Sequence, residues 1–308
     1  MSNILPNLLI VGAAKSGTTS LHNYLNQHEN IFMCSPKEPH FLINKEIGEK
    51  RIPKGILNID EYEQLFNGEE DKIYRGESSV MYLSFPEITI PNIKKYLRDD
   101  VKIIIMLRNP VDRAYSGYQH VKRYNVMESL SFETALKVSE SRYQNTPDMT
   151  PASRYLELGL YFKQVKMFIE EFENVHIIIY DDYKNDFNSE ILKVFKFLNL
   201  NAIEVNAKQQ HMVGGWEWNS ELIKAIMMKD NGLKRYVKLL LPFQSIRKII
   251  RKLLQNRSTK KVRKIRPSTK KWLKNFYKED VELLSLLLNR NLNNWIREVI
   301  VKYPPIKI

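Results

Sequence analysis

The sequence has a single cysteine, Cys34, among its 308 residues, so no disulfide can form within the chain. We expect Cys34 to be buried as a small apolar side chain. Long apolar runs are also missing: residues 8–11 are too few for a signal peptide, and no window reaches the ~20 apolar residues of a membrane helix. These absences argue against a disulfide scaffold, a cysteine-bound metal cluster and a membrane-anchored enzyme. We therefore expect a cytoplasmic protein that binds no metal.

Acidic residues are missing from one long segment. Residues 231–278 contain 17 Lys and Arg but no Asp or Glu, whereas the rest of the chain carries 31 basic and 35 acidic side chains. The net charge of +13 therefore originates in this one segment. Such a local excess of positive charge is typical of a surface that meets an anionic partner.

Short apolar runs alternate with helical patterns along the chain, which predicts an α/β fold with a central parallel β-sheet of about five strands flanked by helices. A turn with glycines follows the first run, as it does in P-loop NTPases, so we expect a central sheet like theirs. The predicted strands are residues 7–12, 31–34, 73–77, 101–107 and 175–180, and the predicted helices include one that opens at Pro110 and one at 189–198. We expect one domain over residues 1–308, with a basic helical lid inserted at 231–266.

Ligands of parallel sheets bind beyond the carboxyl ends of the strands. The candidate site segments are therefore residues 13–19, 35–40, 78–79 and 108–109. The first of them reads Gly-Ala-Ala-Lys-Ser-Gly-Thr-Thr over residues 12–19, between a strand and a helix. Its backbone N–H groups, hydroxyls and Lys15 suit a phosphate. In the nucleotide-kinase loop the lysine follows the second glycine, whereas Lys15 precedes Gly17, which disfavours a Mg²⁺-dependent nucleoside triphosphatase.

This loop resembles the 5′-phosphosulfate loop of the sulfotransferases that use 3′-phosphoadenosine 5′-phosphosulfate (PAPS), whose pattern is K-[SGT]-G-T-[TS]. The resemblance implies that the loop holds the 5′-phosphate and that Lys15 also stabilises charge on the leaving phosphate oxygen. The implied ligands are Lys15, Ser16, Gly17, Thr18 and Thr19.

Residues 107–118 resemble the 3′-phosphate segment of the same family, L-R-[DN]-P-x-x-R-x-x-S-x-[YWH]. The resemblance implies that Arg108 and Ser116 bind the 3′-phosphate, a role that suits the fork of an arginine. Arg113 also fits the pattern, and we weigh a structural ion pair equally with a ligand role.

Residues 35–41 (SPKEPHF) resemble the K-E-x-H-F segment of glycan sulfotransferases such as those of heparan sulfate. The resemblance implies that Glu38 is the catalytic base and that His40 assists it, because the acceptor must lose a proton as it attacks sulfur. One departure concerns Ser78, which stands where these enzymes often carry a lysine. With that lysine missing, Lys15 and His40 are expected to carry more of the chemistry.

The resemblance covers nearly the whole chain and extends to a basic loop before the last helix. There the family usually closes over the nucleotide, and residues 260–267 fit this place, which implies that Lys261 and Arg263 contact the 3′-phosphate or belong to the lid. The preceding amphipathic basic helix, 244–256, has three interpretations: packing on the domain, recruitment of an anionic glycan, or docking to an anionic membrane. Trp216 and Trp218 either stack on a sugar or adenine, or pack in the protein.

The sequence therefore predicts a sulfotransferase that moves a sulfuryl group from PAPS to a hydroxyl or amine of a glycan or glycolipid, by in-line displacement and without a metal. Peripheral contact with a membrane or polysaccharide is expected through 244–266. Two alternatives are a P-loop kinase-like phosphotransferase and a non-catalytic anion- or nucleic-acid-binding protein. Nucleic acid is not expected as a partner, because no recognised binding motif accompanies the basic stripe.

Overall fold

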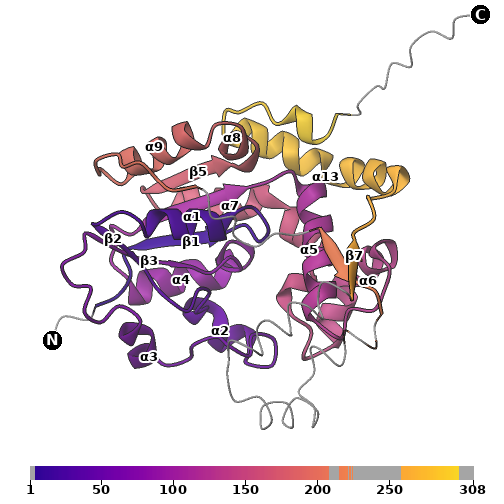
Figure 1. Ribbon diagram of the computed structural model, residues 1–308, viewed down its shortest axis with the longest axis horizontal. Coiled ribbons are helices and arrows are strands. Elements are labelled where there is room, and N and C mark those ends of the chain that lie inside the picture. The colour runs from indigo at the N-terminus through magenta and orange to yellow at the C-terminus, as the bar shows by residue number, and fades with distance from the viewer. Residues whose placement is uncertain (1–3, 208–214, 221, 223, 225–257, 298–308) are drawn as a thin grey trace, which may run out of the picture.

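The computed structural model describes residues 4–207, 215–220, 222, 224 and 258–297. A five-stranded parallel sheet forms its centre, in the order β2-β3-β1-β4-β5 (Figure 1). The strands are β1 (Leu8–Gly12), β2 (Ile31–Met33), β3 (Tyr74–Ser78), β4 (Lys102–Leu107) and β5 (Val175–Ile179). The predicted α/β fold with about five parallel strands is confirmed.

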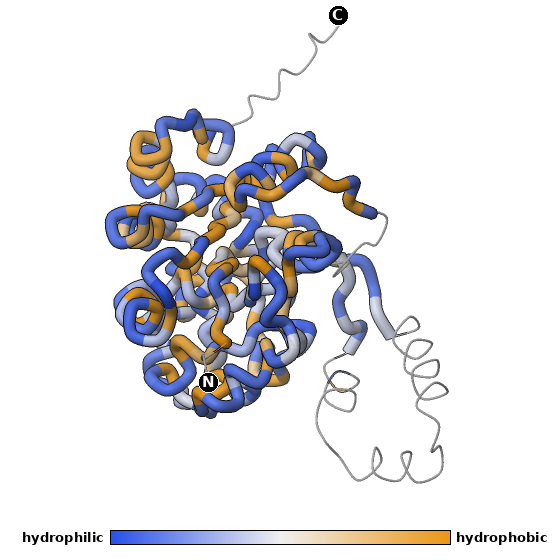
Figure 2. The backbone as a smooth tube through the Cα atoms, turned by 90° about the vertical axis from the view of Figure 1, so that its left-hand side faces the viewer, coloured by the Kyte–Doolittle hydropathy of each residue, from blue (hydrophilic) through white to orange (hydrophobic). Residues whose placement is uncertain are grey.

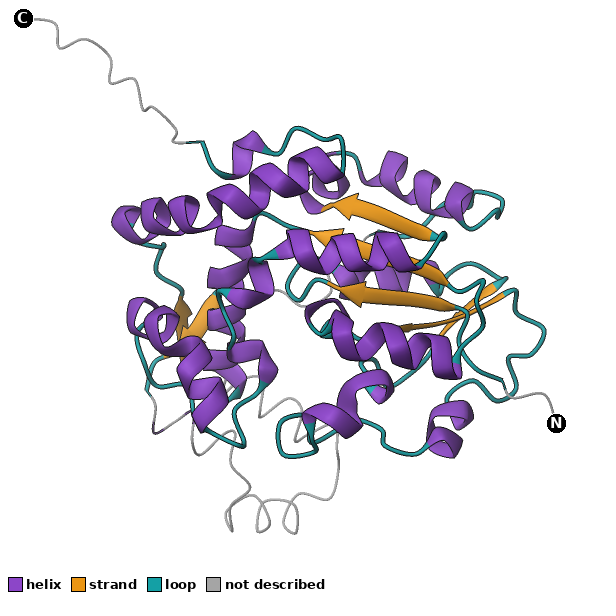
Figure 3. Cartoon of the chain, turned by 180° about the vertical axis from the view of Figure 1, so that it is seen from behind, coloured by secondary structure: helices purple, strands orange, loops and turns teal. Residues whose placement is uncertain are grey.

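Helices cover both faces of this sheet (Figure 3). They are α1 (Thr18–Leu25), α2 (Phe41–Ile47), α3 (Ile59–Gln64), α4 (Pro86–Tyr96), α5 (Pro110–Tyr124), α6 (Phe132–Asn145), α7 (Tyr161–Glu171), α8 (Tyr180–Asn185), α9 (Phe187–Phe197) and α13 (Pro267–Leu287). Hydropathy alternates along the helices, as expected where one face packs on the sheet (Figure 2).

Successive side chains of the central strands enter two separate apolar clusters. In β4, Ile103 and Ile105 pack into the cluster that includes α4, α7 and α13, while Ile104 and Met106 pack into the cluster that includes α1 and α9. Because successive side chains of a strand point to opposite faces, a strand buried on both faces must be apolar throughout. This is why residues 103–107 are an uninterrupted apolar run.

Helix α5 starts where β4 ends, and local chemistry fixes that start. Asn109 accepts a hydrogen bond from the N–H of Val111 (3.0 Å), and Pro110 occupies the first helical position, where it needs no donor. Arg108 is therefore held at the carboxyl edge of the sheet, between the strand and the helix.

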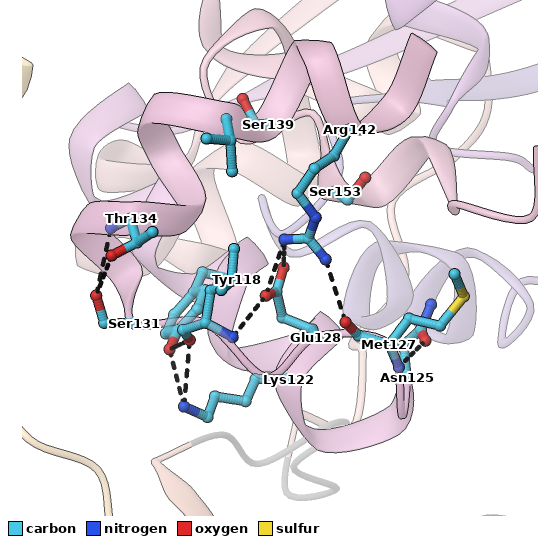
Figure 4. A network of polar contacts seen from close by, with 12 residues as sticks. Tyr118, Lys122, Asn125, Met127, Glu128, Ser131, Thr134, Ser139, Arg142 and Ser153 are labelled. Atoms are coloured by element: carbon cyan, nitrogen blue, oxygen red, sulfur yellow. Dashed lines mark hydrogen bonds and ion pairs between the residues drawn. The ribbon is translucent and has the colours of Figure 1, made fainter. Parts of the chain in front are cut away.

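A buried carboxylate ties the loop between α5 and α6 to α6. Glu128 is fully buried, and its two oxygens lie 3.1 Å from one guanidinium nitrogen of Arg142 (Figure 4). The hydroxyl of Tyr155 also donates to Glu128, at 2.6 Å. A paired and hydrogen-bonded charge of this kind fixes geometry, since loss of one partner would leave the other uncompensated.

A small antiparallel pair of strands, β6 (Trp216–Trp218) and β7 (Thr259–Lys261), lies beside α5 and α6 (Figure 1). Trp218 donates its indole N–H to the carbonyl of Arg123 (3.0 Å), and Trp216 meets Tyr124 edge to face. The tryptophans thus pack on the end of α5. The predicted helix 244–256 and most of the predicted lid lie outside the described residues. None of the helices in the described part of the chain is long and apolar enough to cross a membrane.

Two glycines offer a matched test of how tightly this fold is packed. A Cβ added at Gly12 would lie 2.6 Å from Cβ of Leu83 and 3.2 Å from the carbonyl oxygen of Val80, atoms that cannot swing away. Gly12→Ala should therefore lower the free energy of unfolding by about 1–3 kcal/mol. Gly117→Ala is the control, because its nearest neighbour would be 3.5 Å away. It should raise stability by about 0.5–1 kcal/mol, since alanine favours a helix. If denaturant unfolding gave the same change in the free energy of unfolding for both variants, that result would contradict this packing.

Candidate functional site

A pocket of about 620 Å³ lies at the carboxyl edge of the sheet. Three predicted segments meet there: the loop after β1, residue 38, and Arg108 together with α5. The predicted site residues in its wall are Lys15, Gly17, Thr18, Thr19, Glu38, Arg108 and Ser116. Residues from distant parts of the sequence thus share one cavity, of a size typical for small-molecule sites.

The loop after β1 bends through two left-handed residues, Lys15 (φ 68°) and Gly17 (φ 96°). Glycine is needed at 17, because a Cβ there would also approach the Tyr180 ring to 3.1 Å. Helix α1 starts directly afterwards, at Thr18. Its first N–H groups have no partner within the helix and carry the positive end of the helix dipole, so this turn can hold an anion. Ser16, in the same loop, is fully buried and does not appear in the described pocket wall.

Lys15 is the most perturbed cation of the site. Its ammonium nitrogen lies 3.4 Å from Nδ1 of His120. Burial, followed by the nearby charge of Arg123, lowers the pKa of Lys15 from 10.5 to about 8, although Glu38 opposes the change. The negative charge of a bound anion would oppose both effects and raise the pKa again. The lysine is mostly protonated near pH 7, and a bound phosphate would hold its proton more firmly.

His120 is a pocket residue that our sequence interpretation missed. Burial and the charge of Lys15 lower its pKa to about 4, so the ring is neutral near pH 7. An ammonium can only donate, so Nδ1 of His120 acts as acceptor. Its position four residues after Ser116 on α5 puts both on the same helix face, which is the signal that could have identified it.

Arg108 links the two segments that the sequence predicts to bind phosphates. Its guanidinium donates to the carbonyl oxygen of Lys15 (3.1 Å) and lies 5.0 Å from the centre of the Tyr180 ring. Arg113 is fully buried and donates to the carbonyl oxygen of Tyr155. Since no carboxylate of the described chain pairs with Arg113, the ion-pair interpretation of this residue finds no support.

Glu38 faces the pocket and lies next to two basic side chains, Lys37 and His40. Its oxygens lie 3.0 Å from Nζ of Lys37 and 3.3 Å from Nε2 of His40. Burial by itself would raise the pKa of Glu38, but Lys37 and the hydrogen-bonded His40 outweigh it and hold that pKa well below its ordinary value. His40 is 8% exposed and stands behind Glu38, outside the described pocket wall.

The predicted lid residues lie beside the pocket and not in its described wall. Lys261 ends β7, and the backbone carbonyl of Arg263 accepts a hydrogen bond from Tyr115, which lines the pocket. Both side chains are exposed, and their contact with a phosphate stays a prediction. Ser78 is fully buried and 2.9 Å from Nδ1 of His22, so it does not replace the missing lysine in the pocket.

Helix α5 forms one wall of the pocket, and the chemistry of its pocket-lining side chains changes along its length. Ser116 lies near its middle, His120 beside Lys15, and Arg123 and Tyr124 at its end. Burial lowers the pKa of Arg123, whose guanidinium lies 5.2 Å from the ring of Trp216. The wall thus passes from the hydroxyl of Ser116, through a neutral imidazole, to a guanidinium packed on aromatic rings. Such a wall offers cationic groups for anions, aromatic rings for a planar or sugar-like group, and one carboxylate, Glu38.

Two kinds of comparison with known proteins both find sulfotransferases. A family model described as "Sulfotransferase domain" matches residues 5–284. The solved structure of a sulfotransferase from Alicyclobacillus acidocaldarius superposes with a TM-score of 0.72 and 28% identity, covering 95% of this chain and 99% of that one.

Two curated human proteins are similar over part of the chain. "Carbohydrate sulfotransferase 15" is 26% identical over 250 residues, which is 65% of this chain and 44% of that protein. "Bifunctional heparan sulfate N-deacetylase/N-sulfotransferase 2" is 29% identical over 181 residues, or 58% of this chain and 20% of that protein. The chain thus spans less than half the length of these relatives.

The charges around Lys15 can be tested by measuring its pKa. Arg123→Met should raise the pKa of Lys15 above about 8, because it removes a repelling charge, and Glu38→Gln should lower it further. NMR titration of the protein with ¹³C-methylated lysines reports this value, and Lys15→Arg identifies the signal by its loss. A wild-type Lys15 that titrates near 10.5 would show that the side chain is solvated.

Proposed function

Since this chain belongs to the sulfotransferase family, we propose that it transfers a sulfuryl group from PAPS to a hydroxyl or amine of a carbohydrate acceptor. The observation that carries the proposal is the meeting of Lys15, Arg108 and Glu38 in one pocket. Two of them are cations suited to the phosphates of the donor, and the third is a carboxylate able to take a proton.

The donor half of the pocket fits a nucleotide with two phosphate groups. The turn at the start of α1, with Lys15, Thr18 and Thr19, suits the 5′-phosphate. Arg108 and Ser116 suit the 3′-phosphate, because an arginine fork and a hydroxyl offer several donors to one dianion. The link from Arg108 to the carbonyl of Lys15 (3.1 Å) supports a fixed spacing between the two anion sites.

The reaction is an in-line displacement at sulfur. The acceptor oxygen or nitrogen forms a bond to sulfur, the bond from sulfur to the 5′-phosphate oxygen breaks, and the electron pair leaves with adenosine 3′,5′-bisphosphate. Lys15 stabilises the charge that grows on the leaving oxygen. Glu38, kept ionised by Lys37 and His40, accepts the proton of the acceptor.

The far end of α5 supports a carbohydrate as the acceptor. Beyond Lys15 and His120 the wall consists of Arg123 and Tyr124, with Trp216 packed against both. Aromatic faces pack on the apolar side of sugar rings, and a guanidinium recognises their acidic or hydroxyl groups. The names of the similar carbohydrate and heparan sulfate sulfotransferases support this class. A free glycan and the sugar of a glycolipid share this chemistry.

The choice between nucleotides tests the part of the pocket proposed to bind the donor. Adenosine 3′,5′-bisphosphate should raise the melting temperature, whereas ATP with Mg²⁺ should have little effect, because the lysine stands before Gly17. Lys15→Ala and Arg108→Ala should each weaken bisphosphate binding about 10-fold or more, since each removes a charged hydrogen bond. Lys166→Ala, on the exposed side of α7, is the control. Preferred binding of ATP with Mg²⁺ would favour a kinase instead.

Loss of the base tests the catalytic half. Glu38→Gln should reduce sulfate transfer by about 10²- to 10⁴-fold, because the amide cannot accept the proton. Bisphosphate binding measured by calorimetry should change little. Glu61→Gln, exposed on α3, is the control for a lost carboxylate. Assays use ³⁵S-labelled PAPS with a panel of glycans and glycolipids. Full activity of Glu38→Gln would remove this residue from the mechanism.

A further inference from the structure

We infer that Glu77, a residue without contact to the pocket, is a positioning residue that fixes the loop bearing Glu38 and His40. This inference rests on the proposed role of Glu38 as the base. Glu77 lies in β3 and is fully buried. A buried carboxylate is costly unless its surroundings compensate it, so its partners indicate what it does.

Three hydroxyl groups converge on this carboxylate. Tyr62 and Tyr82 donate to one oxygen, each at 2.7 Å, and Ser79 donates to the other at 2.6 Å. A carboxylate that accepts from three O–H donors needs no counter-ion to satisfy its lone pairs. Glu77 thereby dictates the direction in which each hydroxyl points its proton.

Two of the three hydroxyls also accept hydrogen bonds from the backbone next to Glu38, at residues 40 and 42. The oxygen of Ser79 accepts the backbone N–H of His40 (3.0 Å), and the oxygen of Tyr82 accepts the backbone N–H of Leu42 (3.2 Å). Each hydroxyl can accept from the backbone because its own proton is committed to Glu77. The carboxylate thus holds residues 40 and 42 through two separate relays.

The loop needs such support because its backbone is unfavourable. Glu38 (φ 65°) and His40 (φ 54°) are both left-handed, a conformation that costs roughly 1–2 kcal/mol for a residue with a side chain. His40 is also the N-cap residue of α2, and its own side chain makes no capping hydrogen bond. The relays satisfy two N–H groups at this turn. They hold the backbone in the form that sets Glu38 3.3 Å from His40.

Tyr62 provides a matched control within the same cluster. It donates to Glu77 as the other two do, but no hydrogen bond of the described chain links its hydroxyl to the loop. Its ring stacks on Phe41 (4.4 Å between centroids), a contact that phenylalanine would keep. Tyr62→Phe therefore removes one donor to Glu77 and leaves both relays intact.

The relay variants are Ser79→Ala, Tyr82→Phe and Glu77→Gln. The glutamine can donate to Ser79, which leaves the serine proton without its acceptor and disturbs the relay. We expect each variant to lower kcat by about 10- to 100-fold, as small misplacements of a reacting group do. KM for PAPS and bisphosphate binding should stay within about twofold, because the donor half is untouched. Tyr62→Phe should keep kcat within about twofold of the wild type, even if its melting temperature falls as much as that of the relay variants.

Amide hydrogen exchange tests the positioning without any need for activity. Ser79→Ala and Tyr82→Phe should speed exchange of the amides of residues 40–42, whereas Tyr62→Phe should not. If the wild type transfers no sulfate to any acceptor, the proposed function fails, and exchange still decides whether Glu77 orders the loop. Wild-type kcat with unchanged exchange in the relay variants would overturn the inference. So would an equal loss of kcat in Tyr62→Phe, because that result would indicate general destabilisation.

Discussion

The parallel pairing of β1 with β3 on one side and β4 on the other is the constraint on which the site depends. It brings the carboxyl ends of three strands to one edge, so that the phosphate loop, Glu77 with Ser79, and Arg108 emerge side by side. Apolar side chains on both faces of these strands keep them buried between the two layers of helices. The chemistry at the edge therefore rests on the burial of residues that never touch a substrate.

Much of this arrangement could be predicted from the sequence. The apolar runs located β1, β4 and β5, because doubly buried strands must be apolar throughout, and residues 31–34 and 73–77 were expected as additional strands. The rule that ligands bind beyond strand ends then located the pocket, and the family patterns identified Lys15, Arg108 and Glu38 in it. Local signals were sufficient here, since each of these residues directly follows a predicted strand or lies in a recognisable segment.

Other features depend on contacts that no local pattern records. His120 and Arg123 belong to the site because α5 turns one face to the pocket. The partners of Glu77 come from residues 62, 79 and 82, so their convergence requires the folded chain. The burial of Ser16 and His40, and the exposure of Lys261 and Arg263, were equally beyond the sequence. Such outcomes are set by packing between elements, which periodicity alone does not specify.

Helix α5 has a consequence for how sulfotransferases of this kind can diversify. Its Ser116 and Arg123 are seven residues apart, or about 10 Å along the axis of one helix. Under the proposed function, substitutions in its last turn would alter the choice of acceptor while the donor end keeps its geometry. One helix would thus separate donor binding from acceptor binding, and an engineer seeking a new acceptor would begin at Arg123 and Tyr124.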